Sequence, residues 1–290
     1  MGRKKTIAQL IIANSMQGKR VLDILQQELS LSNRQIRKVI RTRGLFINGR
    51  LVHSNYNVKT GEELRVKLPI KEQIKIEIYP MELSIIYEDP WLLGINKPAG
   101  INVHNTKSQE TPALVSGVAY YLHNKKEHIT PRPIHRLDKD TSGIVLFAKS
   151  ADIQSKLSAD WNSLLVTKEY WALVEGTIYE QGSIDLPVRN KSALTIYYPQ
   201  KQYNGFTEVN IKLMTGRTHQ IRKHFKAIGH PVLGDKIYNA HSCFSLPRLA
   251  LHAIKLNFTH PVTNKEIQLQ TKSPREDLLI NSLRQFSTSL

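Results

Sequence analysis

The segment 135–143, with the sequence HRLDKDTSG, gathers side chains that acid–base and nucleophilic chemistry uses. Asp138 lies between Arg136 and Lys139 within it. A carboxylate flanked by cations tends to stay ionised, and an ionised carboxylate can act as a nucleophile or as a base. The alternative interpretation is a charged turn before the apolar strand predicted at 144–147.

A second segment, TGRTHQIRKH at 215–224, carries a similar density of polar groups. We predict that it opens a helix that ends at Gly229, because glycine is favoured just after a helix. His219 and Arg222 lie on the face opposite the apolar side chains. This polar face suits phosphates or a carboxylate partner. An ordinary cationic surface helix is the alternative.

The sequence lacks the motifs of several common enzyme classes. It contains no GxxxxGK[ST], GxGxxG, HExxH or GxSxG, so nucleotide hydrolysis, dinucleotide redox chemistry, zinc peptidases and α/β-hydrolases lack their usual support. His219 and His224 are five residues apart and lie on different helix faces. Asp138 and Asp140 are not followed by an acidic ligand at the spacing of an EF-hand. We therefore expect no metal and no cofactor.

The charge balance points to a polyanionic partner. The 290 residues hold 41 Lys and Arg against 24 Asp and Glu, a net charge of +17, and residues 1–80 hold 16 of the basic but only 6 of the acidic residues. Such a surplus indicates nucleic acid first and an anionic membrane surface second. No apolar run reaches the roughly 18–20 residues of a membrane span. General solubility charge is the alternative.

Much of this early charge falls on one predicted helix. Ser32 and Gln35 have the spacing of a capping box at its start. Its apolar face consists of Ile36, Val39 and Ile40. Its cationic face consists of Arg34, Arg37, Lys38 and Arg41. Asn48-Gly49 between two short apolar runs predicts a β-hairpin after the helix.

The rest of the chain predicts an α+β fold. Strand-like runs dominate from residue 83 onward, with helical stretches near 112–123, 150–160 and 218–228. Because strands and helices do not alternate regularly, we expect a mixed, mainly antiparallel β-sheet with flanking helices. The expected domains are a basic N-terminal tail at 1–17, a small α/β domain with its connector at 18–80, and a larger domain at 81–290.

Six motifs in register along residues 83–262 resemble the RluA-type pseudouridine synthases. They are EDP with NKPAG at 88–100, HRLDKDTSG at 135–143, KEYWALVEG at 168–176, TGRTHQIR at 215–222, IGHPVLGD at 228–235 and RLALHA at 248–253. Residues 18–68 resemble the small RNA-binding domain named after ribosomal protein S-four, which commonly precedes that catalytic domain. Residues 189–206 depart from the usual family pattern.

The resemblance implies an enzyme that breaks the N1–C1′ bond of a uridine in RNA, rotates the base and rejoins it through C5 without a cofactor. It implies that Asp138 is the catalytic residue, either attacking C1′ or removing a proton at C2′. Arg222 maps to the arginine that pairs with this aspartate. Tyr170 maps to the tyrosine that stacks on the base and takes part in proton transfer.

Further RNA contacts are expected from cations near these motifs. Arg136 and His135 adjoin Asp138, and we expect Arg136 to help extrude the target nucleotide, a step that costs a few kcal/mol. Lys97 is expected to contact phosphate. Arg217 belongs to the cationic surroundings of the carboxylate.

We therefore expect an RNA pseudouridine synthase, an isomerase, that modifies ribosomal RNA, with transfer RNA as the alternative substrate. A non-catalytic RNA-binding or ribosome-assembly factor on the same fold is the alternative class. A Mg²⁺-dependent phosphodiesterase using Asp138 and Asp140 lacks further carboxylates in the motifs. We also expect a monomer that binds no membrane and acts in the cytoplasm, since a single cysteine is compatible with a reducing compartment.

Overall fold

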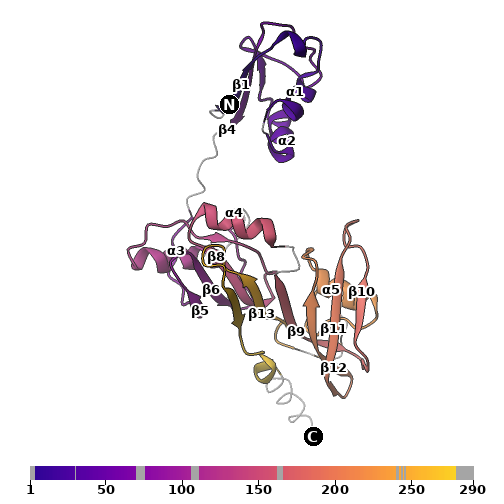
Figure 1. Ribbon diagram of the computed structural model, residues 1–290. Helices are drawn as coiled ribbons and strands as arrows, with labels where there is room; N and C mark the ends of the chain where they lie inside the picture. The colour runs from indigo at the N-terminus through magenta and orange to yellow at the C-terminus, as the bar shows by residue number, and fades with distance from the viewer. Residues whose placement is uncertain are drawn as a thin grey trace. The chain divides into compact units, whose positions relative to one another are not determined.

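The computed structural model describes residues 4–29, 31–69, 76–105, 111–161, 166–239, 242, 244 and 246–278. The chain divides into two compact units, Met1–Lys75 and Ile76–Leu290 (Figure 1). The division therefore falls five residues before the expected boundary at residue 80. Within the described ranges, no helix is long and apolar enough to cross a membrane.

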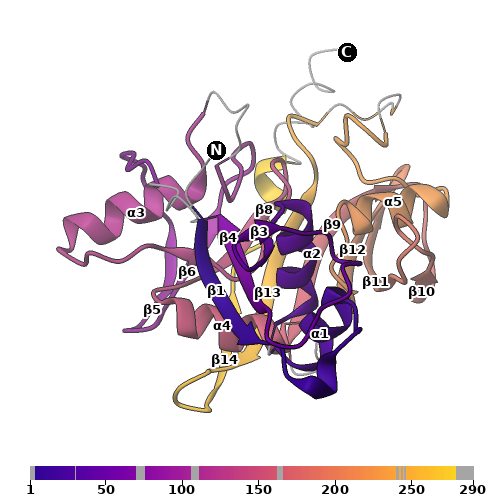
Figure 2. The ribbon, with the colours of Figure 1, turned by 90° about the horizontal axis from the view of Figure 1, so that it is seen from above.

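The first unit is a four-stranded antiparallel sheet with two α-helices packed against it (Figure 2). The strand order is β1-β4-β2-β3. Val21 and Ile24 of the first helix and Ile36 and Val39 of the second are buried against the sheet. The elements are β1 (Lys4–Ile11), a short 3-10 helix (Asn14–Met16), α1 (Val21–Gln27), α2 (Asn33–Arg41), β2 (Leu45–Ile47), β3 (Arg50–Leu51) and β4 (Glu63–Pro69).

The expectation of a separate tail at 1–17 is wrong. Residues 4–11 form β1, which pairs with β4 along its whole length, and Ile7 and Leu10 pack against the core. A register shift between Thr6 and Ala8 interrupts the pairing. This bulge breaks the two-residue alternation that identifies a strand in sequence, which is why the segment resembles a basic tail.

Helix α2 begins as the sequence predicts. The Ser32 hydroxyl accepts a hydrogen bond from the backbone N–H of Gln35, and the Gln35 side chain accepts one from the backbone N–H of Ser32, which completes a capping box. Arg37 and Arg41 are exposed, as expected for the cationic face, and Lys38 is half-buried. The side chain of Arg34 lies outside the part that the structure describes. Asn48-Gly49 forms the predicted hairpin turn between β2 and β3, with φ of 46° and 80°.

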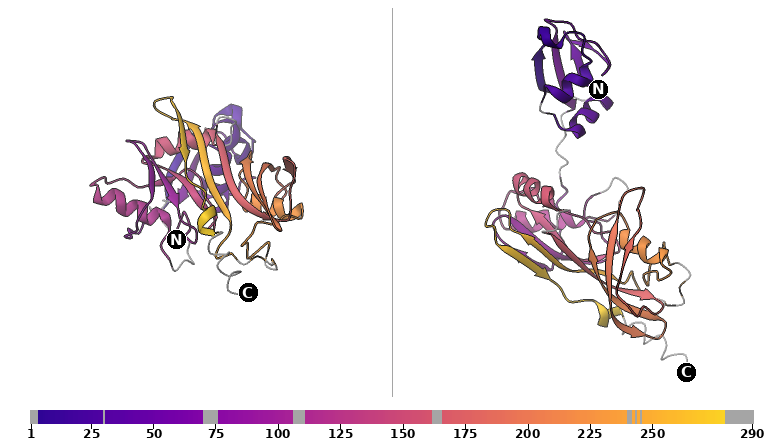
Figure 3. Two further views of the ribbon diagram at one scale, coloured as in Figure 1. Left: turned by 90° about the horizontal axis from the view of Figure 1, so that it is seen from below. Right: turned by 45° about the vertical axis from the view of Figure 1, so that its right-hand side comes forward.

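The second unit is built on one mixed, mainly antiparallel sheet with flanking helices, as predicted (Figure 3). The main path of the sheet is β10-β11-β12-β9-β13-β8-β6-β5, and β13 joins β8 in parallel. The strands are β5 (Ile85–Glu88), β6 (Leu92–Lys97), β7 (Arg132–Pro133), β8 (Ser142–Ala148), β9 (Thr167–Glu175), β10 (Gly182–Asp185), β11 (Leu194–Tyr203), β12 (Phe206–Leu213), β13 (Leu251–Thr259) and β14 (Glu266–Gln270). The helices are α3 (Leu114–Asn124), α4 (Ala151–Asp160) and α5 (Gln220–Ala227).

The two faces of this sheet pack against different helices. Successive residues of a strand point to opposite faces, so Val145 of β8 packs with α3 and α5 while Ile144 and Leu146 pack with α4. On β9, Tyr170 belongs to the α3 and α5 side, and Trp171 belongs to a separate cluster on the other side. The central strand β9 thus presents Tyr170 on the face of the sheet that carries α5.

Strand β11 is the main element that the sequence did not predict. It covers ten residues of the segment that departs from the family pattern, and it pairs with β12. Pro199 interrupts its sequence, and the pairing shifts register between Pro199 and Lys201. The long pairing with β12 overrides the local disfavour of proline in a strand.

Candidate active site

Asp138 lies in the loop between β7 and β8, on the face of the sheet that carries Tyr170. Its neighbour Leu137 is buried in the core, and the backbone N–H of Thr141 donates to the Asp138 carbonyl over 3.2 Å. The loop leads into β8, whose second residue, Gly143, has a φ of 113°; a Cβ atom there would lie 2.3 Å from the carbonyl oxygen of Ala253 on β13. Only glycine allows this close approach, which sets where the loop leaves the sheet.

A buried hydrogen-bond network supports the end of the same loop. The Ser142 hydroxyl lies 2.7 Å from Nδ1 of His252 and accepts a bond of 3.1 Å from Arg248. Nε2 of His252 lies 2.9 Å from the Thr271 hydroxyl. Burial, and then the charge of Arg248, lowers the pKa of His252 to about 4. His252 is therefore neutral near pH 7, and the RLALHA motif acts here as the support of the Asp138 loop.

Arg222 reaches the Asp138 carboxylate from α5. Its Nη1 lies 3.8 Å from Oδ2 of Asp138, so the predicted pairing of these two residues is confirmed. The Arg222 side chain is buried, and its Nε and Nη2 donate to the two carboxylate oxygens of Asp235 over 2.6 and 2.7 Å. A two-point bond of this kind sets the plane of the guanidinium group, so Asp235 determines how Arg222 faces Asp138.

Asp235 is itself held by the backbone that follows it. Oδ1 accepts from the N–H of Ile237 over 2.9 Å and from that of Tyr238 over 3.0 Å. Although burial opposes it, these bonds and the bonds from Arg222 keep the pKa of Asp235 below its ordinary value. Asp235 thus provides a fixed negative charge behind Arg222.

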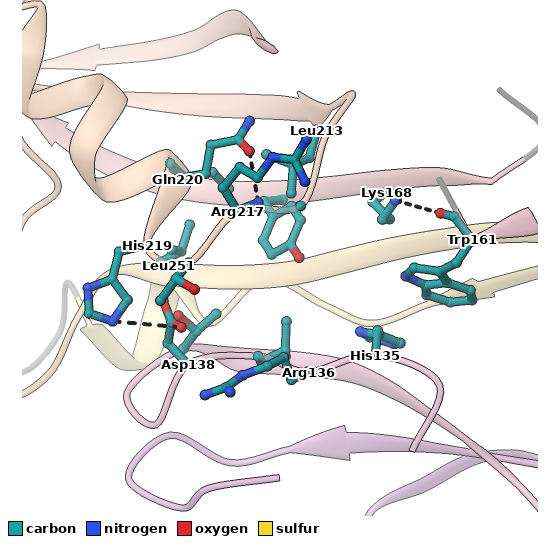
Figure 4. Close-up of a pocket in the computed structure, with 16 residues that line it drawn as sticks. His135, Arg136, Asp138, Trp161, Lys168, Leu213, Arg217, His219, Gln220 and Leu251 are labelled. Carbon is teal, nitrogen blue, oxygen red and sulfur yellow. Dashed lines mark hydrogen bonds and ion pairs between the residues drawn. The ribbon is translucent and has the colours of Figure 1, made fainter. Parts of the chain in front are cut away.

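His219, the N-cap residue just before α5, lies close to Asp138. Its Nε2 lies 3.8 Å from Oδ1 of Asp138 (Figure 4). Its Nδ1 lies 3.1 Å from the Tyr238 hydroxyl. Burial lowers the pKa of His219, and the charge of Asp138 opposes this effect. Its φ of 56° is in the left-handed region, which is uncommon for a residue with a side chain and is seen more often at functional sites.

The turn before α5 is anchored to the sheet by a buried glutamine. Oε1 of Gln220 accepts from the Thr215 hydroxyl and from the backbone N–H of Arg217 over 2.8 and 3.0 Å. Its Nε2 donates to the carbonyl of Leu194 and the hydroxyl of Thr195 on β11 over 3.1 and 3.0 Å. Strand β11 therefore fixes the segment that presents His219 and Arg222.

These segments enclose a cavity of about 290 Å³. Asp138 and His219 lie together in Figure 4, away from Trp161 and Lys168, and His135 lies beside Trp161. Tyr170 also lines the cavity, and burial, together with the charge of Asp138, raises the pKa of its hydroxyl. The hydroxyl therefore stays protonated near neutral pH, where it can donate a hydrogen bond. The lining residues are 135–138, Thr141, Trp161, Lys168, Tyr170, Leu213, 216–221 and Leu251.

The cations predicted to contact RNA lie in three different settings. Arg136 is exposed at the cavity, and Arg217 lines the cavity while its Nε donates to the Ser192 carbonyl over 3.2 Å. His135 is stacked on Trp161 at 4.7 Å, and its Nε2 accepts a hydrogen bond from the backbone N–H of Leu146. Burial lowers the pKa of His135 to about 3. It is therefore neutral and cannot pair with phosphate as a cation.

The expectation that Lys97 contacts phosphate is contradicted. Its side chain is fully buried, and its ammonium group donates to the carbonyls of Pro98, Ile101 and Lys139 over 2.8, 2.9 and 3.1 Å. Burial lowers its pKa to about 7 against the opposing charges of Asp140 and Asp138. Lys97 therefore links the NKPAG segment to the Asp138 loop by hydrogen bonds to backbone carbonyls of both.

Several residues of the site were not singled out by sequence reasoning. Asp235 belongs to the IGHPVLGD motif. The motif marks the segment as part of the family pattern but does not predict that Asp235 pairs with Arg222. Tyr238 and Trp161 lie outside the motifs, and their contacts depend on the tertiary fold. Among the described residues, no group of three or more His, Cys, Asp or Glu side chains could hold a metal ion.

Comparisons with known proteins agree with this geometry. A family profile described as RNA pseudouridylate synthase matches residues 92–227. The chain is 34% identical over 273 residues to the uncharacterized RNA pseudouridine synthase YlyB of Bacillus subtilis, covering 87% of this chain and 90% of that protein. It is 31% identical over 252 residues to the ribosomal large subunit pseudouridine synthase D of Haemophilus influenzae, covering 77% and 78%. The solved structure titled human RNA pseudouridylate synthase domain containing 4 shares the fold, with a TM-score of 0.59, 23% identity and coverage of 69% of this chain and 92% of that chain.

The sheet, the site and these relatives define an RNA-modifying isomerase. The chain belongs to the RNA pseudouridine synthase family, and its relatives place it with the RluA-type enzymes of that family.

Proposed function

We propose that this synthase isomerises uridine in the RNA of the large ribosomal subunit. Three relatives that are 29 to 31% identical over 77 to 96% of this chain carry the name ribosomal large subunit pseudouridine synthase D. The cationic face of α2 supports an RNA substrate with extended phosphate contacts, because dense cations without acids suit a phosphate backbone. The single observation that carries the proposal is that Asp138 and Tyr170 line one cavity of a family member, with Arg222 paired to Asp138 at 3.8 Å.

In this proposal Asp138 is the catalytic residue. The reaction breaks the N1–C1′ bond, turns the uracil, and forms a C5–C1′ bond. The proton on C5 is lost and N1 gains one, so that no atom is added or removed overall. The carboxylate acts at the sugar, by attack on C1′ or by removal of the C2′ proton. In either route it must carry its charge beside the ribose, and Arg222 faces it with the opposite charge at 3.8 Å.

Tyr170 and Arg136 act on the base and on its extrusion. Tyr170 presents an aromatic ring on which the uracil can stack. Its hydroxyl, kept protonated by a raised pKa, can donate a hydrogen bond to the base. Arg136 is exposed at the cavity, where its side chain can fill the gap that an extruded nucleotide leaves. Because described residues of this one chain build the site, we also propose that it acts as a monomer, in the cytoplasm where its RNA substrate is found.

Mapping of pseudouridines in total RNA tests the proposed substrate. RNA from cells with the gene, without it, and with a plasmid copy is compared. We expect one or a few positions in large-subunit ribosomal RNA to lose the modification without the gene and to regain it with the wild-type copy. An Asp138→Asn copy should not restore them. Loss confined to transfer RNA, or no loss in either RNA, would contradict the proposal.

A further inference from the structure

The first unit contains a small cavity of about 160 Å³ where the end of α2 meets the β2–β3 hairpin. We name it the α2–β3 pocket. Its walls come from α2, from the turn after α2, from β2 and from the residues at and after β3. The lining residues are Ile40, Arg43, Leu45, Leu51, Val52, His53 and Ser54. The cavity is smaller than the roughly 300–1,000 Å³ of common ligand pockets, so it suits one flat ring rather than a large cofactor.

The pocket has an apolar wall that stays open to solvent. Ile40 is 38% exposed and Leu51 is 49% exposed, while Leu45 beneath them is buried. Ile40 was expected to pack into the core with Ile36 and Val39, yet those two residues are buried and Ile40 is not. Single exposed apolar residues are common. Two that line one concave site, beside a half-buried Val52, form a place for an apolar surface to bind.

The charged residues that flank this apolar wall in the sequence are all basic. Arg43 lines the pocket, Arg41 follows Ile40, and Arg50 precedes Leu51. Residues 34–50 hold six cations and no acid. An apolar cavity with a cationic rim is complementary to a nucleotide, because the base has an apolar face and the phosphates on either side of it are negative. None of the seven lining residues is acidic, which disfavours a protein partner with mixed surface charges.

The backbone holds Arg43 at the mouth of the pocket. Its φ of 51° is left-handed, its N–H donates to the Ile40 carbonyl over 3.1 Å, and its carbonyl accepts from Nζ of Lys4 over 2.9 Å. The next residue, Gly44, approaches the backbone of Lys67 on β4 so closely that a Cβ atom would lie 2.0 Å from its carbonyl oxygen. The turn is thus fixed before RNA arrives, which lowers the entropy lost on binding.

We propose that the α2–β3 pocket binds one unpaired nucleobase of RNA, with the neighbouring phosphates on Arg41 and Arg50. The aliphatic wall and the flat guanidinium group of Arg43 would contact the faces of the base, as in other recognition of splayed-out bases. Phosphate contacts position a protein on RNA without selecting a site. The pocket would add a preference for RNA with an unstacked nucleotide. This inference rests on the proposed function only in taking RNA as the substrate.

Binding of the full-length protein to two RNA hairpins tests the proposal. One hairpin carries a single bulged adenosine, which cannot be isomerised to pseudouridine, and the other is fully paired. We expect Leu51→Ser to weaken binding to the bulged hairpin about tenfold, within the range found for removal of one base contact. Binding to the paired hairpin and the salt dependence of both should stay unchanged, since no charge is removed. Ile40→Ser should reproduce this pattern.

The matched control is Ile11→Ser, which removes an apolar side chain that is 59% exposed on β1 of the same unit. It should leave binding to both hairpins unchanged, and circular dichroism should show that all three variants remain folded. Equal weakening for both hairpins in the Leu51 and Ile40 variants would overturn the proposal. Unchanged binding to both would also overturn it. Because no isomerisation is measured, the result is independent of the proposed ribosomal target.

Discussion

Replacement of Asp235 by asparagine tests whether this residue sets the geometry of Arg222. The variant keeps the shape of the side chain but removes the negative charge of the carboxylate, which accepts two hydrogen bonds from Arg222 over 2.6 and 2.7 Å. Asp235 is 1% exposed and Arg222 is 3% exposed, so water cannot replace the lost partner. Loss of one partner from a buried ion pair costs about 3–5 kcal/mol. We expect Asp235→Asn to lose stability of this order.

Tryptophan fluorescence during urea unfolding measures this loss. The chain has three tryptophans, Trp91, Trp161 and Trp171, and all three lie in the second unit, so the signal reports the catalytic unit alone. Asp185→Asn is the control, because Asp185 is exposed on β10 of the same unit. That substitution should change the unfolding free energy by no more than about 0.5 kcal/mol.

The same variant should impair catalysis more than binding. Without Asp235, Arg222 is no longer held in its plane, and its Nη1 no longer faces Asp138 in a fixed position. Single-turnover measurements should show a lower rate of pseudouridine formation at saturating enzyme, with RNA affinity unchanged. If Asp235→Asn keeps both the unfolding free energy and the rate of the wild type, the positioning role given to Asp235 is refuted.

Three further predictions concern the support of the Asp138 loop and the cationic face of α2 in the first unit. Gly143→Ala should destabilise the catalytic unit by about 3–5 kcal/mol, because the added Cβ meets the backbone of β13, whereas Gly216→Ala, with open space around it, should have little effect in the same urea assay. His252 has a folded pKa of about 4, below its ordinary value, so the unfolded state takes up the proton first as the pH falls. The contribution of His252 to the unfolding free energy should therefore fall by up to about 3 kcal/mol as the pH drops from 6.5 to 4. His252→Gln should flatten this pH dependence. Arg37→Ala combined with Arg41→Ala should reduce the slope of log affinity against log salt by about 1.4–1.8 for RNA binding. An unchanged slope would contradict phosphate contacts on this face of α2.

The fold was predictable where local signals agree with tertiary packing. The capping box at Ser32, the Asn48-Gly49 turn and the apolar runs of the central strands each act through neighbouring residues, so sequence alone reveals them. Strand β1 and strand β11 were not predicted, since a bulge in one and Pro199 in the other disturb the alternation that marks a strand. Their pairing depends on partner strands that are distant in sequence.

The site was predictable in its motifs but not in all of its contacts. The pairing of Arg222 with Asp138 was expected from the family resemblance and is present. The role given to Lys97 was wrong because a lysine is usually exposed, whereas here, at the end of β6, three carbonyl groups accept from its buried ammonium group. Asp235 could not be assigned a partner, since its bond to Arg222 joins α5 to a loop thirteen residues away through the folded core.

Asp138→Asn is the most direct test of the central claim that this carboxylate performs the isomerisation. The variant removes the charge but keeps the size of the side chain, and the rate of pseudouridine formation is measured on a ribosomal RNA fragment that the wild-type enzyme modifies. We predict no detectable pseudouridine, with RNA affinity and the urea unfolding of the catalytic unit both retained. Pseudouridine formation at the wild-type rate in this variant would contradict the account.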